Sequence, residues 1–119
     1  MAKYKRRGGV IVMPIFMLNS EAYLALTSYS RSLLVLMQIH WYKYKPVDYG
    51  VREAAVKMSC NERTARKAFD QLQELGFIEC MEQSVFRSRT QSKARSWRLT
   101  WMPYKEREPT DDWRVDLGK

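Results

Sequence analysis

The stretch from Ser59 to Ile78 constrains the fold more than any other part of the chain. Its apolar residues recur three and four positions apart, as they do along one side of an α-helix: Ala65, Ala68, Phe69, Leu72 and Leu75. Asn61 can cap such a helix by accepting a hydrogen bond from a backbone N–H of the first turn. Gly76 can end it, since glycine readily adopts the left-handed backbone conformation. We therefore predict a helix over about 61–75, followed by a strand over Phe77–Met81.

The opposite side of this predicted helix is basic over its first two turns. Arg63, Arg66 and Lys67 lie there, and Asp70 follows at a spacing that allows it to pair with either of the last two. Cations near a helix N-terminus oppose the helix dipole, so they do not serve the stability of the helix. They suit a helix that presents its N-terminal half to phosphates and base edges.

A second helix is predicted directly before the first, over Val51–Met58, after Gly50. Its Ala54, Ala55 and Met58 form a face on which another helix can pack closely. Only Ser59 and Cys60 separate it from the capping residue Asn61. Two helices joined by so short a turn, with the second one capped and basic at its start, form the helix-turn-helix pattern.

The part of the chain before residue 50 supplies the remaining predicted helices. A helix from Thr27 or Ser28 to about Trp41 is expected to be central and largely buried, since its apolar face is broad: Leu33, Leu34, Val35, Leu36, Met37, Ile39 and Trp41. A short helical turn over Ala22–Leu26 should precede it, starting at Asn19–Glu21. Val10–Leu18, which Pro14 interrupts, is predicted to be an extended segment lying on the core.

Met1–Gly9 is expected to be a mobile arm, because it combines two glycines with four cations: Lys3, Lys5, Arg6 and Arg7. Two interpretations stay open for this arm. It is either a solvated tail or a clamp on the DNA backbone or minor groove.

After the second helix of the pair, a basic hairpin is predicted. Arg95–Trp101 alternates, with Trp97, Leu99 and Trp101 on one face and Ser96, Arg98 and Thr100 on the other. The polar linker before it, Glu82–Ala94, is basic. It contains Arg87, Arg89 and Lys93, and Arg95 follows it directly. A strand, a basic loop and a strand after a helix-turn-helix indicate a wing that straddles phosphates or enters a minor groove.

The tail over Met102–Lys119 leaves two alternatives. Thr110–Trp113 is either a capped turn that docks Trp113 on the domain, or part of a disordered peptide whose Trp113 anchors a partner protein. The chain then divides into an arm and extended segment over 1–18, a folded domain over 19–101 and a tail over 102–119.

Charge is distributed unevenly along the 119 residues, whose formal net charge is +8. Residues 1–101 hold 17 Lys and Arg against 8 Asp and Glu, whereas residues 102–119 hold 4 against 5. A basic domain favours nucleic acid or an anionic membrane as its partner. The apolar runs are too short to span a bilayer, and the N-terminus does not read as a secretory signal. Cys60 and Cys80 fit two thiols in a reducing cytoplasm.

Catalytic and metal-binding motifs are not apparent. His40 is the only histidine, and the two cysteines are not spaced as metal ligands. The chain has no Gly-rich phosphate loop and no combination of nucleophile and base. We therefore expect neither an enzyme nor a cofactor.

The order of these features resembles that of a known family. The features are a Leu-rich helix followed by Arg52–Ala55, Thr64–Phe69, Gly76–Ile78 and Ser96–Thr100. They are similar to those of bacterial winged helix-turn-helix proteins, in the replication-initiator-like and phage or mobile-element regulator group. The resemblance covers about residues 19–101. It implies an α+β fold, mostly helical, with a small antiparallel β-hairpin as the wing.

The same resemblance implies sequence-specific binding of double-stranded DNA in the cytoplasm, on the nucleoid. The role would be that of a transcription regulator, a replication-initiator-like factor or an excision factor, acting alone, as a homodimer or as an array. In this interpretation Arg63 and Thr64 contact base edges, while Asn61, Arg66 and Lys67 contact the DNA backbone. The wing cations would hold phosphates or a narrow minor groove: Arg87, Arg89, Lys93 and Arg95.

The alternative is a winged-helix module that binds another protein, in which case the cations of the second helix are only a solvated face. The coincidence of basic residues in the arm, the helix and the wing favours DNA, because a random solvated hairpin would mix charges of both signs.

Overall fold

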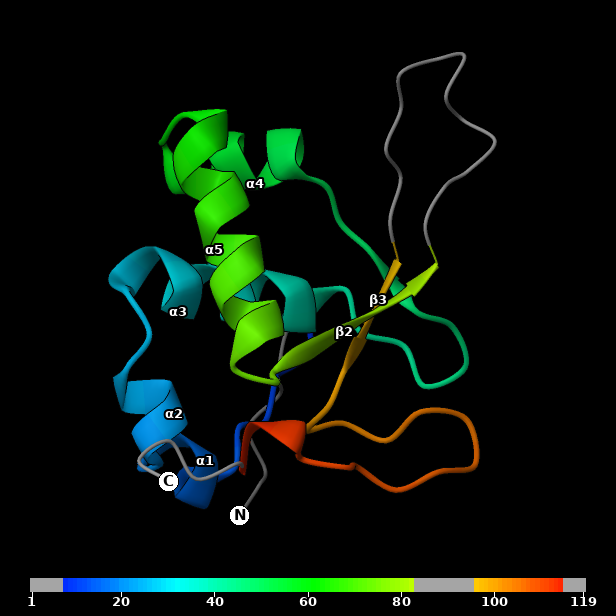
Figure 1. Ribbon diagram of the computed structural model, residues 1–119. Helices are drawn as coiled ribbons and strands as arrows, with labels where there is room; N and C mark the ends of the chain where they lie inside the picture. Colours follow the sequence, from blue (N-terminus) through cyan, green and yellow to red (C-terminus); the bar gives the residue numbers. More distant parts are fainter. Residues whose placement is uncertain (1–7, 83–95, 115–119) are drawn as a thin grey trace.

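The computed structural model describes residues 8–82 and 96–114. Its elements, in chain order, are α1 (Ile15–Leu18), α2 (Glu21–Leu24), α3 (Ser28–Ile39), β1 (Val47–Asp48), α4 (Val51–Met58), α5 (Glu62–Glu74), β2 (Ile78–Glu82), β3 (Ser96–Leu99) and the 3-10 helix η2 (Asp112–Arg114). Helices α3 to α5 lie beside a small sheet, and η2 lies near the end at which β2 begins (Figure 1). The chain is thus an α+β domain with five α-helices in its described residues, as the sequence predicted at this coarse level.

The sheet has three antiparallel strands in the order β1-β3-β2. Ile78 of β2 lies opposite Leu99 of β3, and Val47 of β1 lies opposite Trp97 on the other side of β3. The register between β2 and β3 shifts between Cys80 and Glu82. The sequence predicted β2 and β3 within one or two residues but not β1, because two residues after a proline carry no alternating pattern.

Side-chain caps start the helices at the residues that the sequence indicated. The Asn61 side chain accepts a hydrogen bond from the Thr64 N–H at 2.8 Å, at the start of α5. Thr27 and Ser20 act in the same way at the starts of α3 and α2. Gly76 has a φ of +87°, the left-handed conformation expected after α5. These capping predictions are confirmed.

The core centres on Phe77, which is fully buried between the helices and the sheet. Its ring is parallel to that of Trp113, with centroids 6.1 Å apart, and Tyr23 and Trp101 meet it edge-on. Leu33, Leu34 and Met37 of α3 complete this centre. Aromatic rings bury large apolar areas, which allows a domain of this size to hold together without disulfides.

The helix and the buried face predicted for α3 both extended too far toward the C-terminus. The helix ends at Ile39, whose side chain is 58% exposed, so Ile39 does not widen the buried face. Trp41 lies beyond the helix and donates from its indole N–H to the carbonyl of Pro103 at 3.3 Å.

The prediction of an extended Val10–Leu18 on the core was wrong in two respects. Ile15–Leu18 forms α1, because the φ of Pro14 (−67°) and its carbonyl suit the residue before a first helical turn. Several apolar side chains of this segment are also exposed, including Val10, Val12, Ile15 and Phe16. Only Met17 is fully buried in α1.

Both faces of β3 are buried, although its residues alternate between apolar and polar. Ser96, Arg98 and Thr100 are buried like the residues that alternate with them. The Arg98 guanidinium contacts a Glu79 carboxylate oxygen at 2.7 Å and an Asp112 carboxylate oxygen at 3.4 Å. The segment around Thr110–Asp112 covers this face, and the sequence alone does not show which strand such a segment will cover.

The docked alternative for the tail is the one found in the structure. Asp111 N–H donates to the Thr100 carbonyl at 2.8 Å, and Trp113 in η2 is only 3% exposed. Trp113 therefore belongs to the core of the same domain and is not available as an anchor for a partner protein.

Candidate nucleic-acid interface

The tight joint between α4 and α5 fixes the relative position of the two helices. Ser59 adopts the left-handed conformation, with φ 55° and ψ 49°. The N–H of the next residue, Cys60, then donates back to the carbonyl of Ala55 at 3.0 Å. This pattern closes α4 and lets α5 start at once. The sequence predicted the joint but not the left-handed serine, which is uncommon for a residue with a side chain.

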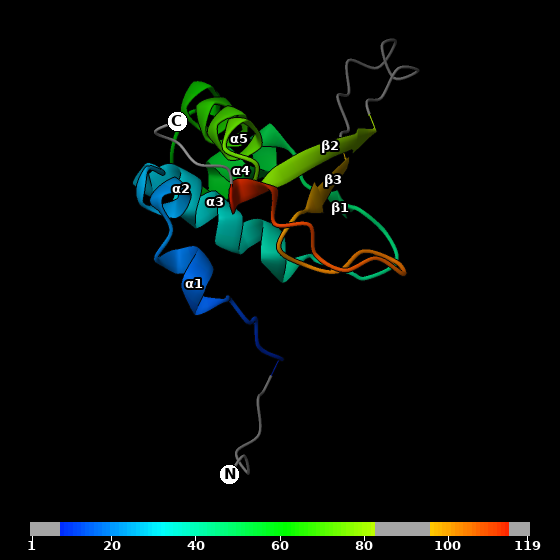
Figure 2. The same cartoon turned by 60° about the horizontal axis from the view of Figure 1, so that its bottom comes forward.

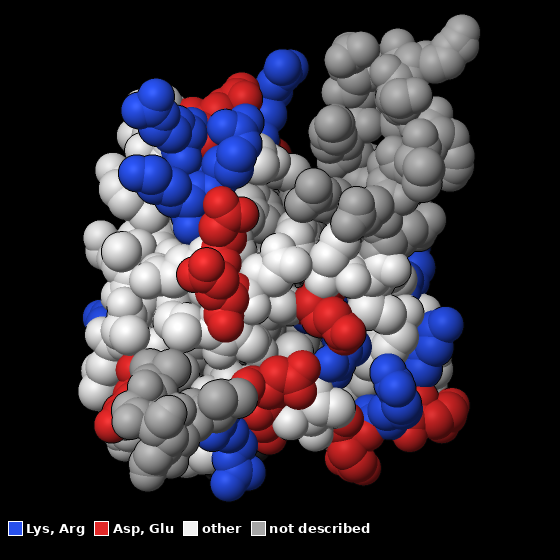
Figure 3. Space-filling view, viewed as in Figure 1, with Lys and Arg blue, Asp and Glu red and all other residues white. Residues whose placement is uncertain are grey.

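The two sides of α5 differ as the sequence predicted. Ala65, Ala68, Phe69 and Leu72 are buried, and the Phe69 ring stacks on Trp97 of β3 at 5.5 Å. Asn61, Arg63, Arg66 and Lys67 are exposed, whereas Thr64 is half-buried. Figure 3 shows the cationic side chains gathered over the end of the molecule at which α5 begins. The structure thus brings together the five candidate residues of α5 on one surface.

The cations of this surface have no ion-pair partner in the described part of the chain. Within residues 8–82 and 96–114, the ion pairs are Arg52–Glu62 and those of Arg98 with Glu79 and Asp112. Asp70 therefore does not pair with Arg66 or Lys67, contrary to the spacing argument. The Arg52–Glu62 pair is 3.6 Å long and largely exposed, so it is weak. Arg63, Arg66 and Lys67 can therefore bind an external anion without first breaking an ion pair with a carboxylate of the described residues.

Gln71 positions α5, a role that the sequence argument missed. Its side-chain oxygen accepts from the Thr27 N–H at 3.0 Å and from the Ser30 hydroxyl at 2.6 Å. Its NH2 group donates to the Ala25 carbonyl at 3.3 Å. These bonds tie α5 to the junction of α2 and α3 and so help to set the angle of α5. The one signal for this role in the sequence was the position of a polar residue, Gln71, next to the apolar stripe of the helix.

The predicted wing lies mostly outside the described residues. Arg87, Arg89, Lys93 and Arg95 all fall between residues 82 and 96 and have no described position. In Figure 1, β2 ends and β3 begins toward the end of the molecule at which α5 begins. Arg98 of β3, the next cation along the chain, is 6% exposed and faces two carboxylates, so it contributes no free charge.

The described start of the chain leads away from α5. Residues 8–14 lie on the side of the molecule away from α5 in Figure 2. The cations of the arm precede these residues and lie outside the described part. The arm therefore does not leave the domain beside the basic half of α5, as the argument from three basic elements assumed.

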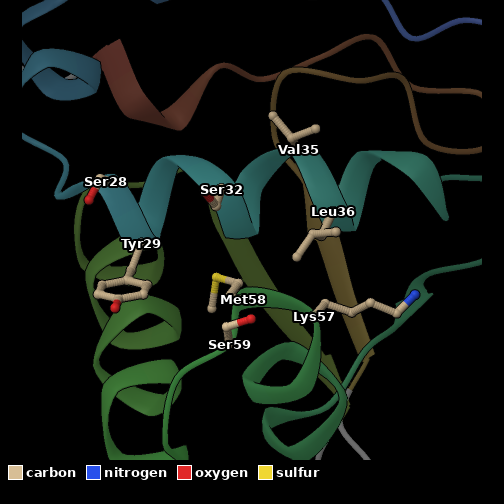
Figure 4. Close-up of a pocket in the computed structure, with 8 residues that line it drawn as sticks. All are labelled: Ser28, Tyr29, Ser32, Val35, Leu36, Lys57, Met58 and Ser59. Atoms are coloured by element: carbon tan, nitrogen blue, oxygen red, sulfur yellow. The ribbon is translucent and has the colours of Figure 1, made fainter.

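A groove of about 660 Å³ lies between α3 and the end of α4, lined by Ser28, Tyr29, Ser32, Val35, Leu36, Lys57, Met58 and Ser59. Tyr29 and Met58 project into it from its two walls, and Lys57 extends along its edge (Figure 4). Its lining contains hydroxyls and one amine but neither a carboxylate nor a histidine that could act as a base. In the described part of the chain, His, Cys, Asp and Glu do not gather in groups of three that could hold a metal ion.

None of the helices in the described ranges is both long and apolar enough to cross a bilayer. Comparisons of the chain with protein-family models, curated proteins and solved structures found no match. The argument for function therefore depends on the site itself.

Proposed function

We propose that this chain binds double-stranded DNA by placing the N-terminal half of α5 in a major groove. One observation carries the proposal. Arg63, Arg66 and Lys67 are exposed together on the first two turns of a helix whose other side is buried, and no described carboxylate forms an ion pair with them. Such a helix is held rigidly from behind while its cations remain available for phosphates.

The positions along α5 suggest different roles for its residues. Asn61, Arg63 and Thr64 lie in the turn that would enter the groove first, and an arginine there can form a bidentate pair with guanine. Such a pair is worth about 1–3 kcal/mol of discrimination between bases. Arg66 and Lys67 lie one turn farther along and would contact phosphates. The Asn61 side chain already accepts from Thr64 N–H, so its free NH2 group would be its donor to DNA.

The arrangement of the elements is compatible with a winged helix. The order α3, β1, α4, α5, β2, β3 includes a helix-turn-helix followed by an antiparallel strand pair. The sequence that connects β2 to β3 contains four cations, Arg87, Arg89, Lys93 and Arg95, which we assign to phosphate contacts beside the groove. We propose that the chain acts as a regulator or replication-initiator-like factor, which would place it on the nucleoid.

A protein-interaction module is the second candidate, and one observation favours it. The exposed residues of α5 include Glu62, Asp70 and Glu74 as well as the three cations, so the exposed face carries charges of both signs. The acidic residues would repel phosphates. However, Asp70 and Glu74 lie in the C-terminal half of α5, which a groove-binding helix turns away from the DNA.

Titration of labelled random duplex at about 50 and 200 mM salt separates the two candidates. A DNA-binding protein with several phosphate contacts loses affinity by orders of magnitude between these conditions, whereas a protein-only module binds at neither. Once a preferred sequence is selected from a duplex library, Arg63→Ala should reduce the preference for it over random duplex. Equal losses on both duplexes would contradict the role of Arg63 in base readout.

A further inference from the structure

Two loops that are distant in the sequence share one pattern. Residues 42–45 are Tyr, Lys, Tyr and Lys, and residues 104–107 are Tyr, Lys, Glu and Arg. In each loop the first and the last residue form an isolated antiparallel bridge, so the two residues between them lie at the tip of a tight turn. We call residues 42–45 and 104–107 the paired loops.

Hydrogen bonds hold the paired loops side by side. The Lys105 N–H donates to the Lys43 carbonyl at 2.7 Å. The indole N–H of Trp41, directly before the first loop, donates to the carbonyl of Pro103, directly before the second, at 3.3 Å. In Figure 1 the two loops lie together at the right, whereas α5 lies at the left. The paired loops therefore form one preorganised surface, separate from the basic half of α5.

Aromatic rings and cations alternate on this surface. Tyr42 and Tyr44 are 58% and 54% exposed, and their ring centroids are 6.3 Å apart. The Lys43 Nζ lies 5.5 Å from the centroid of the Tyr44 ring, and the Lys105 Nζ lies 5.4 Å from that of Tyr104. Each loop thus carries a ring with a positive charge directly beside it, and the first two rings keep more than half of their area for a further contact.

The cations of the paired loops have no ion-pair partner within residues 8–82 and 96–114: Lys43, Lys45, Lys105 and Arg107. Glu106 in the second loop and Glu108 after it reduce the local excess of positive charge. Charge alone would therefore give a polyanion little affinity for this surface, and a ligand must also use the rings.

This combination favours single-stranded nucleic acid over other anionic partners. An unpaired base has an open face that can stack on a tyrosine while the next phosphate meets a lysine. In a duplex the neighbouring bases cover that face. An anionic bilayer is bound by cations together with apolar side chains that enter it, whereas the most exposed rings here carry hydroxyl groups. An acidic protein would depend on charge, which the two carboxylates weaken.

We propose that the paired loops bind single-stranded nucleic acid. Bases stack on Tyr42 and Tyr44, and phosphates contact Lys45, Lys105 and Arg107. Base sequence should matter little, because every base has a face that can stack. This activity goes beyond the binding of duplex by α5 and does not depend on it.

Fluorescence anisotropy of labelled oligothymidine and oligouridine, each of about 20 nucleotides, tests the proposal. The double variant Tyr42→Ala, Tyr44→Ala should bind at least about fivefold more weakly than the wild type, as expected for the loss of one stacked base or more. Tyr42→Phe with Tyr44→Phe keeps the rings and should bind as the wild type does. Tyr29→Ala is the matched control, since Tyr29 is 41% exposed on α3. The oligonucleotide bound more tightly identifies DNA or RNA as the ligand.

Labelled duplex and vesicles of phosphatidylserine and phosphatidylcholine complete the test. The Ala double variant should keep the duplex affinity of the wild type, so a failure of the α5 proposal can be recognised separately. Circular dichroism establishes that each variant is folded. Equal affinity of the wild type and the Ala double variant for both oligonucleotides, or an equal loss in Tyr29→Ala, would overturn the proposal. So would a loss of vesicle binding in the Ala double variant without a loss of oligonucleotide binding.

Discussion

At the scale of single residues, two polar side chains hold α5 in place. Asn61 caps its first turn, and Gln71 ties its last turn to the α2–α3 junction through two backbone groups and one hydroxyl. The cap could be predicted from the sequence, because the geometry of capping is local. The role of Gln71 could not, since its partners Ala25, Thr27 and Ser30 are more than 40 positions away.

Replacement of Asn61 tests the cap. Asn61→Ala leaves the Thr64 N–H without its side-chain acceptor and should lower the free energy of unfolding by about 1 kcal/mol. Urea denaturation followed by circular dichroism measures the change. Asn61→Ser keeps a capping oxygen and should be nearly neutral. If both variants were equally stable, the capping hydrogen bond would not contribute as the structure indicates.

Tyr49 should make the protein sensitive to alkaline pH. Burial raises the pKa of its hydroxyl, and the neighbouring charge of Glu53 adds to the shift. The folded chain thus holds this proton more tightly than the unfolded chain, so the contribution of Tyr49 to stability is present below about pH 10 and is lost as the pH rises above it.

The variant Tyr49→Phe isolates this effect. Its free energy of unfolding should fall less steeply than that of the wild type above about pH 10. At neutral pH it should lose little or no stability, because the Tyr49 hydroxyl is buried without a hydrogen-bond partner in the described part of the chain. Parallel stability curves across the alkaline range would contradict the assignment.

At the scale of elements, local sequence patterns predicted the bounds of helices better than they predicted which surfaces are buried. The periodicity of apolar residues and the capping residues gave α2, α4 and α5 nearly to their ends, since both signals lie within the element itself. The covered side of Val10–Leu18 was predicted wrongly, and the alternation along β3 did not indicate that both of its faces are buried. Burial at those places is decided by where residues 110–113 pack in the folded domain, over β3 and not over Val10, and this depends on contacts distant in sequence.

The joint between α5, β2 and η2 offers a sharp test of packing. A Cβ atom at Gly76 would lie 2.5 Å from the carbonyl oxygen of Asp112, at a φ of +87° that disfavours side chains. Gly76→Ala should therefore destabilise the protein by more than about 1 kcal/mol and release the docked Trp113. Trp fluorescence and chemical denaturation report both effects.

Gly50→Ser is the control for this variant. No atom lies within 4 Å of a Cβ built at Gly50, its φ is −110°, and serine is a good N-cap for α4. This change should be neutral or slightly stabilising. A Gly76→Ala protein as stable as Gly50→Ser would show that η2 does not pack against the end of α5.

At the scale of the whole molecule, the two ends differ in chemistry. One side presents the exposed cations of α5 (Figure 3), and the uncharged segment before α1 lies on the side away from α5 (Figure 2). The sequence predicted the basic end, because charge and helix periodicity are both readable along the chain. It did not predict that the described start of the chain, from Gly8, lies away from α5, which is a property of the assembled domain.

The dependence of duplex affinity on salt, compared between two triple variants, tests the central claim most directly. One variant combines Arg63→Gln, Arg66→Gln and Lys67→Gln on α5. The other combines Lys45→Gln, Lys105→Gln and Arg107→Gln, which removes three exposed cations from two loops that are joined by the Lys105 N–H and the Lys43 carbonyl. The net charge is the same in both variants, so only the position of the removed charges differs.

We expect the α5 variant to bind duplex more weakly and to reduce the slope of log affinity against log salt by about 0.9 for each phosphate that the three α5 cations neutralise in the wild type. The loop variant should keep the slope of the wild type. Equal slopes for the two variants would show that the attraction is a general effect of net charge, and α5 would then not be the DNA-binding element.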